Sequence, residues 1–358
     1  MRRAVLLVLL LLLLALPASG CVNLRNKNVT GLEVDARSTT LCPGYETDLS
    51  IGVRLDDGKL LRPVGQGGSV LWKGLSFEID GPARMAGRDR LALSPDPRDS
   101  WGRPVRWRVT TPDHPGVSAE GVIGIRYDCE FAAWLGGSEG EEGTDGDDGA
   151  DGNDGHSGPN PDDHGGDGDA GRHGGHGENG AHGTNGHLTE VRVAFANDPA
   201  DGSPVLQVAT ARAGFGGDPW LFAVDAIRGR LIVDAGGGDG GDGGDGGDGG
   251  DGGDGGEGVA PGEGGRGGDG GAGGLGGDGG DGAPIVLIVD HRAAQYLDRI
   301  TLSNRGGRGG DPGRPGDGGD GGSPGAADGT DGADGEHGRV GRDGPVPETR
   351  FETVAPLW

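Results

Sequence analysis

Between residues 31 and 135, hydrophobic and polar residues alternate in short runs. Alternation with a period of two is the pattern of a half-buried β-strand, and turn sequences such as Asp56-Asp57-Gly58 separate the runs. About 100 residues with roughly seven such strands predict an antiparallel sandwich. The clearest runs contain Leu49, Ile51 and Val53; Val105, Trp107 and Val109; and Ile123, Ile125 and Tyr127.

From residue 137 onward the pattern changes to a period of three. Glycine recurs at every third position in 137–187, in Gly-Gly-X triplets in 236–282, and again in triplets over 306–344. A polyproline-II helix has three residues per turn and rises about 3.1 Å per residue. One glycine per turn therefore leaves one face bare, and Gly-Gly-X leaves two. Bare faces let neighbouring backbones approach closely enough to pair their N–H and C=O groups.

Each glycine-rich block is interrupted near its middle, at 161–164, 259–261 and 323–328. The arms on either side are similar in length, which predicts three hairpins packed side by side as a helix bundle. The segments between blocks are apolar, and we expect them to pair as short β-strands at the base of the bundle. They are 188–196, 204–211, 220–226, 230–235, 284–290, 298–303 and 350–354.

Two other structures are compatible with a glycine-rich composition. A collagen triple helix needs three chains and abundant proline, but proline is scarce in 137–187 and the register slips within the blocks. A disordered acidic tail is the second, because the blocks contain few apolar residues. Disorder gives no reason for centrally placed breaks or for blocks that alternate with strands. These two features favour the bundle.

The Gly-Gly-X repeat resembles that of polyglycine-II proteins, a group that includes antifreeze proteins, the glycine-rich PGRS surface proteins and phage adhesin tips. The resemblance covers roughly 137–344 and implies an architecture rather than common descent. Ice binding by antifreeze proteins uses small, weakly polar side chains, whereas the corresponding row here is acidic.

Three sequences in the first part of the chain resemble those of a bacterial immunoglobulin-like domain. They are Leu41-Cys42-Pro43-Gly44, Val70-Leu71-Trp72 and Ile125-Arg126-Tyr127-Asp128-Cys129. The spacing differs from that of antibodies, so the resemblance implies the sandwich architecture alone. The expected fold is therefore all-β, with an immunoglobulin-like sandwich over 31–135 and a glycine-rich repeat domain over 136–358.

The first residues have the parts of a secretory signal. Two arginines precede an apolar run that is too short to span a bilayer, which needs about 20 residues. Ala18-Ser19-Gly20-Cys21 resembles the bacterial lipobox, which implies removal of 1–20 and a lipid, palmitate among its acyl chains, on Cys21. Residues 21–30 then form a tether. By the enteric sorting rule, Val22 implies the outer membrane, where we expect a surface-exposed position.

Lipid on Cys21 would leave Cys42 and Cys129 as an even pair in an oxidising compartment. A disulfide between them would close a loop of roughly 87 residues and contribute on the order of 4 kcal/mol in the chain-entropy model. The alternative is a pair of free buried thiols. We predict the disulfide.

The net charge of −26 excludes nucleic acid as a partner, because such a surface repels phosphate. The expected partners are the membrane, through the lipid, and a polysaccharide or a cell-surface protein. No cofactor is expected, although an acidic row leaves weak calcium binding as an alternative. One row alone would not supply the 6–8 oxygens that calcium takes. The row consists of Asp239, Asp242, Asp245, Asp248, Asp251 and Asp254.

Catalytic motifs carry little weight in this composition. Ser138 and Ser323 each lie in a Gly-X-Ser-X-Gly match, but neither lies between a strand and a helix, as a nucleophile elbow requires. His173, His176 and His182 share one face of a regular helix, too widely spaced for a tetrahedral metal site. The sequence therefore predicts a lipoprotein without enzymatic activity and with a structural or adhesive role. A calcium-responsive binding module is the alternative.

Overall fold

The computed structural model describes residues 21–160, 162–214 and 216–358. The predicted signal sequence, residues 1–20, lies outside them. The described residues form mainly β-strands and few helical turns, so the predicted all-β class is confirmed. The chain divides into two compact units. The first runs to Cys129 and includes 197–205 and Trp358, and the second contains 130–196 and 206–357.

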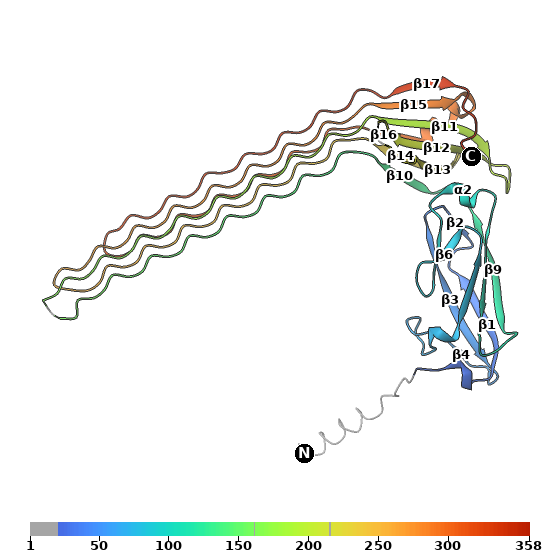
Figure 1. The fold of residues 1–358 in the computed structure, drawn as a ribbon, viewed down its shortest axis with the longest axis horizontal. Helices are drawn as coiled ribbons and strands as arrows, with labels where there is room; N and C mark the ends of the chain where they lie inside the picture. Colours follow the sequence, from blue (N-terminus) through green and yellow to red (C-terminus); the bar gives the residue numbers. More distant parts are fainter. Residues whose placement is uncertain (1–20, 161, 215) are drawn as a thin grey trace, which may run out of the picture. The chain divides into compact units, whose positions relative to one another are not determined.

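Two sheets form the first unit (Figure 1). One has the order β1-β3-β7-β6, with β4 paired to β3, and the other has the order β2-β9-β8-β5. All pairs are antiparallel except β2 with β9. The elements are η1 Leu24–Asn26, β1 Val29–Ala36, β2 Thr40–Leu41, β3 Glu46–Leu55, β4 Leu60–Leu61, η2 Trp72–Gly74, β5 Ser76–Asp80, β6 Ala83–Met85, β7 Arg90–Leu93, α2 Pro97–Ser100, β8 Val105–Thr110 and β9 Ser118–Ile125.

The core of the first unit lies between the two sheets. Ile51 and Val53 from β3 pack in one hydrophobic cluster with Val105 and Val109 from β8 and Ile123 from β9. All five are fully buried, as the period-two alternation predicted. The strand β9 ends at Ile125, however, whereas the predicted run of alternating residues continued to Tyr127. Tyr127 is buried beyond the end of β9 and has ring contact with Trp101, 5.4 Å between centroids.

The boundary between the units differs from the predicted one at residue 135. β10, Glu130–Trp134, pairs in parallel with β14, Arg230–Asp234, and belongs to the second unit. Its Phe131 and Ala133 pack in the core of that unit. The alternating sequence predicted a strand correctly but carried no information on which sheet it joins.

Two further sheets form the base of the second unit. Parallel strands β10, β14 and β16 make one, and the other has the order β13-β12-β11-β15-β17, in which β11, β15 and β17 are parallel. Residues from both sheets bury one hydrophobic cluster. The remaining elements are β11 Thr189–Asn197, β12 Pro204–Arg212, β13 Trp220–Asp225, β15 Ile285–Asp290, η3 His291–Arg299, β16 Ile300–Ser303 and β17 Glu348–Glu352.

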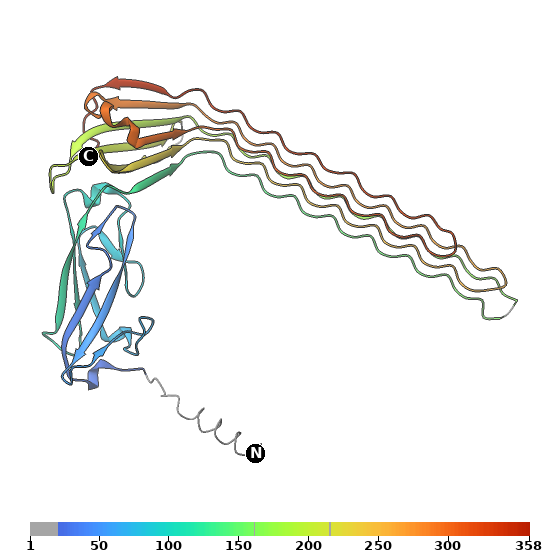
Figure 2. The ribbon, with the colours of Figure 1, turned by 180° about the vertical axis from the view of Figure 1, so that it is seen from behind.

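Six extended arms continue from these strands, side by side in both views (Figures 1 and 2). Arms 1, 3 and 5 leave β10, β14 and β16, and arms 2, 4 and 6 return to β11, β15 and β17. The parallel strand order of each sheet is therefore continued by its three arms. The arms are 136–158, 165–187, 235–257, 262–283, 304–322 and 329–345.

Backbone hydrogen bonds join the arms at every third residue. Within each set of three, parallel neighbours are bonded, as in Gly143 N to Asp242 O at 2.8 Å between arms 1 and 3. Between the two sets, consecutive arms are antiparallel and bonded, as in Gly244 N to Glu178 O at 2.9 Å. The arms therefore form two layers, arms 1, 3 and 5 in one and arms 2, 4 and 6 in the other.

The glycine content of an arm follows the number of arms bonded to it. Arms 3 and 4 are each bonded to four others and have two glycines per triplet, whereas arms 1 and 6 are each bonded to two and have one. A Cβ on Gly237 would lie 1.8 Å from Gly280 O in arm 4, and one on Gly238 would lie 1.9 Å from Ser138 O in arm 1. Each glycine row therefore lies where a neighbouring backbone leaves no room for a side chain.

A 3₁₀ helix, η3, replaces the beginning of the strand that was predicted over 298–303. Asp290 begins it, accepting hydrogen bonds from the N–H of Arg292 at 2.9 Å and from Arg292 Nε at 2.9 Å. Val354 N donates to the other carboxylate oxygen at 3.2 Å. The Arg292 side chain, opposed by burial, lowers the pKa of Asp290 from 3.8 to about 2.

Asp290 should therefore make stability depend on pH. Because its pKa is lower in the folded state, the charged carboxylate stabilises the fold above pH 3.8, and this contribution is lost as pH falls through about 2. We expect Asp290→Asn to unfold more readily at neutral pH, with the difference from wild type narrowing between pH 4 and 2. Chemical denaturation at a series of pH values measures this, and a difference that stays constant over this range would contradict it.

Candidate functional site

The side chains that line the arms are tied to the backbone by a second ladder of hydrogen bonds. Gly143 of arm 1 donates to Asp242 O of arm 3, and in return Asp245 N of arm 3 donates to Asp145 Oδ1 of arm 1 at 2.9 Å. The side-chain acceptor, Asp145, lies two residues after the glycine that donates to arm 3, Gly143. Parallel arms are thus joined twice per turn, once by main chain and once by a short polar side chain.

The acidic row that was considered for calcium belongs to this ladder. Each Oδ1 accepts a backbone N–H of arm 5 or, for Asp254, of Ser323 directly after it. The distances are 2.7 Å for Asp239, Asp242, Asp245 and Asp254, 2.8 Å for Asp251 and 2.9 Å for Asp248. The row is exposed. Sequence reasoning placed these six residues on one face but missed their hydrogen-bond partners, which lie 69 residues away along the chain.

The predicted histidine face has the same role. The Nδ1 atoms of His173, His176 and His182 in arm 2 accept backbone N–H groups of arm 4, at 2.9, 2.9 and 2.8 Å. Asn179 and Asn185 occupy the same row and accept in the same way, at 2.9 and 2.7 Å. An Nδ1 that accepts a hydrogen bond carries no hydrogen itself, so these bonds require the tautomer with its hydrogen on Nε2. The histidines are therefore structural acceptors here.

The residue type in the row of one arm decides whether the facing backbone N–H of the neighbouring arm is hydrogen-bonded. In arm 4, Asp269, Asp278 and Asp281 accept from Thr330, Arg339 and Arg342 of arm 6. The intervening Ala272 and Leu275 lack an acceptor. The bonds from Thr330 lower the pKa of Asp269, since they favour its charged form.

Replacing one acceptor tests the ladder. Asp248→Ala removes the partner of Asp317 N, and we expect a loss of about 1 kcal/mol in the free energy of unfolding, the usual net value of one hydrogen bond. Asp248→Asn keeps an acceptor oxygen and should be close to wild type. The matched control is Glu142→Ala on arm 1, because Glu142 stands in an acceptor row but its side chain makes no hydrogen bond within the described residues. Equal losses for Asp248→Ala and Glu142→Ala in thermal unfolding would count against the ladder.

The outer edge of arm 5, next to arm 6, has few backbone N–H groups left to pair with a further arm. Such an arm would pair with the N–H groups of Gly306, Gly318 and Gly321 in arm 5. These already donate to Asp343 and Asp331 of arm 6 and to Asp328, the residue before that arm, at 3.0, 3.0 and 2.9 Å. Pro312 and Pro315 occupy the same row and have no N–H. The row therefore offers few free donors for lateral growth.

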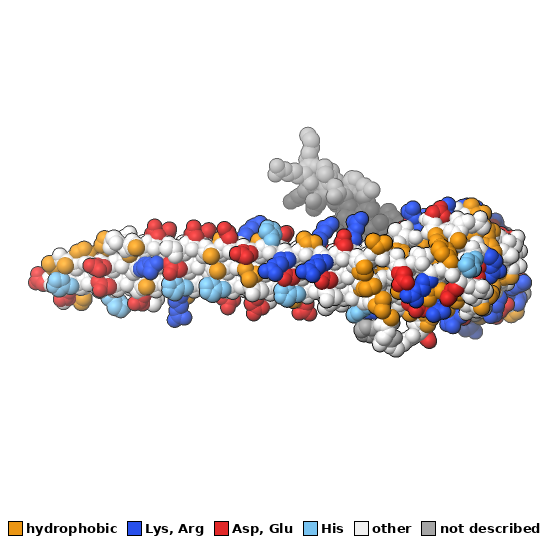
Figure 3. Space-filling view, turned by 90° about the horizontal axis from the view of Figure 1, so that it is seen from above, with side chains coloured by type: hydrophobic (Ala, Val, Ile, Leu, Met, Phe, Trp, Pro, Cys, Tyr) orange, Lys and Arg blue, Asp and Glu red, His pale blue; other side chains and the backbone are white. Residues whose placement is uncertain are grey.

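The outer rows of the two layers differ in charge. In arms 1, 3 and 5 these rows are every third residue over 139–157, 239–257 and 305–320. They carry sixteen carboxylates against three arginines, a formal charge of −13. Those of arms 2, 4 and 6 carry six carboxylates against three arginines, or −3 with histidine neutral. Figure 3 shows the charged side chains standing on a white body of glycine and backbone. The first set of rows is called the acidic face below.

The acidic face does not gather a compact set of metal ligands. Asp148, Asp248 and Asp317 stand side by side on arms 1, 3 and 5, linked by bonds to one another's backbone. Within the described residues, however, the one group of three ligand atoms lying within 4.8 Å of one another is Cys42, Asp128 and Cys129. Two of these are joined in a disulfide, which removes their thiolates as ligands.

That disulfide confirms the predicted pairing. Cys42 directly follows β2 and Cys129 lies four residues beyond the end of β9, and these two strands are parallel neighbours. The two Cα atoms are 6.4 Å apart, and the bridge closes a separation of 87 residues. Cys21 is a free thiol at the exposed start of the described residues. Within the part of the chain that the structure describes, no helix is long and apolar enough to cross a bilayer.

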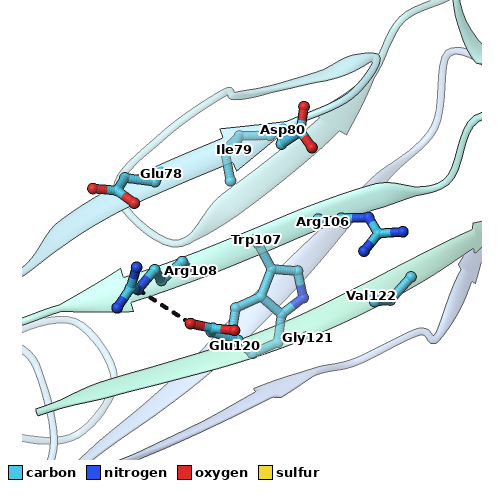
Figure 4. A pocket seen from close by; sticks show the side chains of 9 residues that line it. All are labelled: Glu78, Ile79, Asp80, Arg106, Trp107, Arg108, Glu120, Gly121 and Val122. Atoms are coloured by element: carbon cyan, nitrogen blue, oxygen red, sulfur yellow. Dashed lines mark ion pairs between the residues drawn. The ribbon is translucent and has the colours of Figure 1, made fainter.

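An open depression of about 500 Å³ lies on the outer surface of β5, β8 and β9 (Figure 4). Glu78, Arg108 and Glu120 stand in a row across the three strands, with Arg108 Nε 3.2 Å from Glu120 Oε1. The Trp107 indole packs against Gly121, where a Cβ would lie 2.2 Å from its Cζ2 atom. Gly121 therefore makes room for a core side chain, and the depression presents charged groups without a nucleophile–base pair.

The two serines in glycine-rich motifs lie in the arm region. Ser138 N donates to Thr184 Oγ1 at 2.6 Å, and Ser138 O accepts from Thr184 N at 2.9 Å. Ser323 N donates to Asp254 Oδ1, and Ser323 O accepts from Gly255 N. Both residues thus take part in the ladders through their backbones. In comparisons with protein-family models, with curated proteins and with solved structures, the chain matches none of them.

Proposed function

We propose that the protein is a cell-envelope lipoprotein, anchored in the outer membrane through Cys21, with a structural or adhesive role at the cell surface and no enzymatic activity. The observation that carries this proposal is the hydrogen-bonded array of six arms. Backbone pairing along whole arms makes the glycine-rich region a stiff projection rather than a loose tail. A stiff body with side chains in regular rows suits contact with other surfaces.

The finer architecture belongs to the same proposal. Bonds that recur at every third residue support helices with three residues per turn, as in polyproline II. Pairing within one chain favours the polyglycine-II bundle over collagen, which needs three chains. Two sheets around a single core, with a bridge between Cys42 and Cys129, support an immunoglobulin-like sandwich in the first unit.

Replacing the anchor cysteine tests the location. We expect Cys21→Ser to move the protein from the membrane fraction to the soluble fraction, because a thioether to diacylglycerol cannot form on serine. Detergent phase partitioning and mass spectrometry of the N-terminal peptide measure the change. Cys42→Ser is the matched control, since it removes a cysteine and should leave lipidation intact. Retention of Cys21→Ser in membranes would rule out the lipid anchor.

The adhesive role is tested on whole cells. Cells with the wild-type protein should attach to one another or to a polysaccharide-coated surface more than cells with Cys21→Ser. A variant with destabilised arms, Gly244→Ala, should also attach less while keeping its lipid. Equal attachment by all three strains would refute the adhesive role and leave the anchor untouched.

Calcium responsiveness is the alternative function, and the acidic face is the feature that favours it. A rise in thermal stability at sub-millimolar calcium, absent with magnesium, would support it. Because each row aspartate already uses one oxygen in the ladder, we expect calcium to change the stability of the arms little.

A further inference from the structure

The core of the second unit is open at the end from which the arms leave. A pocket of about 340 Å³ lies there, between the end of β12, the start of β13 and the residue that follows β10. Its lining is mixed, with apolar, hydroxyl, cationic and anionic groups. The side chains that give the pocket this character are Leu135, Thr210, Arg212, Asp218 and Trp220.

Strand alternation places three of these side chains, Thr210, Arg212 and Trp220, toward the space between the sheets. Leu206 and Val208 of β12 lie in the core cluster, so Thr210 and Arg212 share their face. Val224 of β13 lies in the same cluster, and Trp220 is on its face. The pocket is thus the continuation of the core, where polar residues and a half-exposed tryptophan replace aliphatic ones.

Two polar groups of the pocket have no partner within the described chain. Thr210 is fully buried, and its Oγ1 makes no hydrogen bond. Arg212 Nε is buried and also unpaired, although Nη2 donates to Gly136 O at 3.3 Å. A buried donor without an acceptor destabilises a fold, and valine would fill the threonine position without this penalty. Their placement points to a ligand that supplies the missing partners.

The chemistry of the lining fits a sugar ring. Trp220 is 47% exposed and offers an aromatic face to the C–H groups of a pyranose. Sugar hydroxyls both donate and accept, and the pocket offers a donor in Arg212 Nε, an acceptor in the Asp218 carboxylate and a group of both kinds in Thr210. Asp218 would repel an acidic sugar. Few polar groups in a partly apolar pocket are typical of small-ligand sites.

We propose that this pocket binds one pyranose residue of a neutral polysaccharide. The ring stacks on Trp220, and its hydroxyls bond to Thr210, Arg212 and Asp218. This ligand class deepens the adhesive role proposed above. Binding is measured on the detergent-solubilised full chain, so a negative result would leave the membrane anchor standing.

Titration with neutral trisaccharides of glucose, mannose and galactose, followed by calorimetry and ligand-observed NMR, tests the site. Trigalacturonate serves as the acidic probe. We expect at least one neutral trisaccharide to bind, with affinity at least tenfold lower in Trp220→Ala. The matched control is Trp134→Ala, which removes another exposed tryptophan of the same unit, outside the pocket, and should bind as wild type.

Thr210→Val separates binding from folding. It keeps the shape of the side chain and removes the unpaired hydroxyl, so we expect a higher melting temperature together with at least fivefold weaker binding. A purely structural threonine would not give this opposite pair of changes. The site is overturned if no neutral trisaccharide binds, if only trigalacturonate binds, or if Thr210→Val and Trp220→Ala both bind as wild type.

Discussion

Gly244→Ala is expected to lower the free energy of unfolding of the second unit by about 3 kcal/mol, the upper part of the range for overpacking. Gly244 lies in arm 3, donates to Glu178 O at 2.9 Å and accepts from Gly274 N at 2.8 Å. Its Cβ would lie 2.0 Å from Thr144 O and 2.4 Å from Thr144 C. Both atoms are backbone of arm 1, so the arms must separate to admit the methyl group.

Amide hydrogen exchange and thermal unfolding measure this effect. The protection of arm amides around Gly244 should fall, because the bonds to arms 2 and 4 lengthen when arm 1 is displaced. The matched control is Gly166→Ala in arm 2, where the nearest atom to the new Cβ is His156 N at 3.2 Å. We expect that variant to lose far less stability. Equal stability of the two variants would mean that the arms do not touch as described.

The second large effect is expected from removal of the disulfide. Cys42→Ala combined with Cys129→Ala should lower the stability of the first unit by about 4 kcal/mol, since the unfolded chain regains the freedom of a loop with a separation of 87 residues. The loss also concerns the core directly, because Cys42 is 1% exposed and lies next to Leu41 of the hydrophobic cluster.

Denaturant unfolding followed by tryptophan fluorescence measures this loss, because Trp72, Trp101 and Trp107 all lie in the first unit. Cys21→Ser is the control, as this cysteine is exposed and free. Exchange protection of the arms reports separately on the second unit and should stay unchanged. A loss below about 1 kcal/mol would show that the bridge restricts the unfolded chain far less than the loop-entropy model requires.

Much of the local structure could be predicted from the sequence. Alternation at Leu49, Ile51 and Val53 predicted β3 and its buried face. The apolar segments between the glycine blocks predicted β11 to β15 and β17 closely in position. The central breaks predicted where the chain reverses, at bends and turns near 160, 259 and 324. These features depend on residues close together in the chain.

Pairing across the chain could not be predicted in the same way. β10 joins the second unit because it pairs with β14 about 100 residues later, and a period-two pattern is the same whichever sheet the strand enters. The start of η3 depends on Asp290 reaching both Arg292 and Val354. The unpaired Thr210 hydroxyl is visible only once its surroundings are known.

The sequence by itself determined that the glycine-rich region has bare faces at a period of three, because a missing side chain is a property of each residue. Only the tertiary structure decided which face meets which arm, and that Asp239 to Asp254 and His173 to His182 bond to neighbouring backbones. Those partners lie 69 and 96 residues away. Hydrogen bonds have a reach of about 3 Å, so such contacts exist only after the arms are laid side by side.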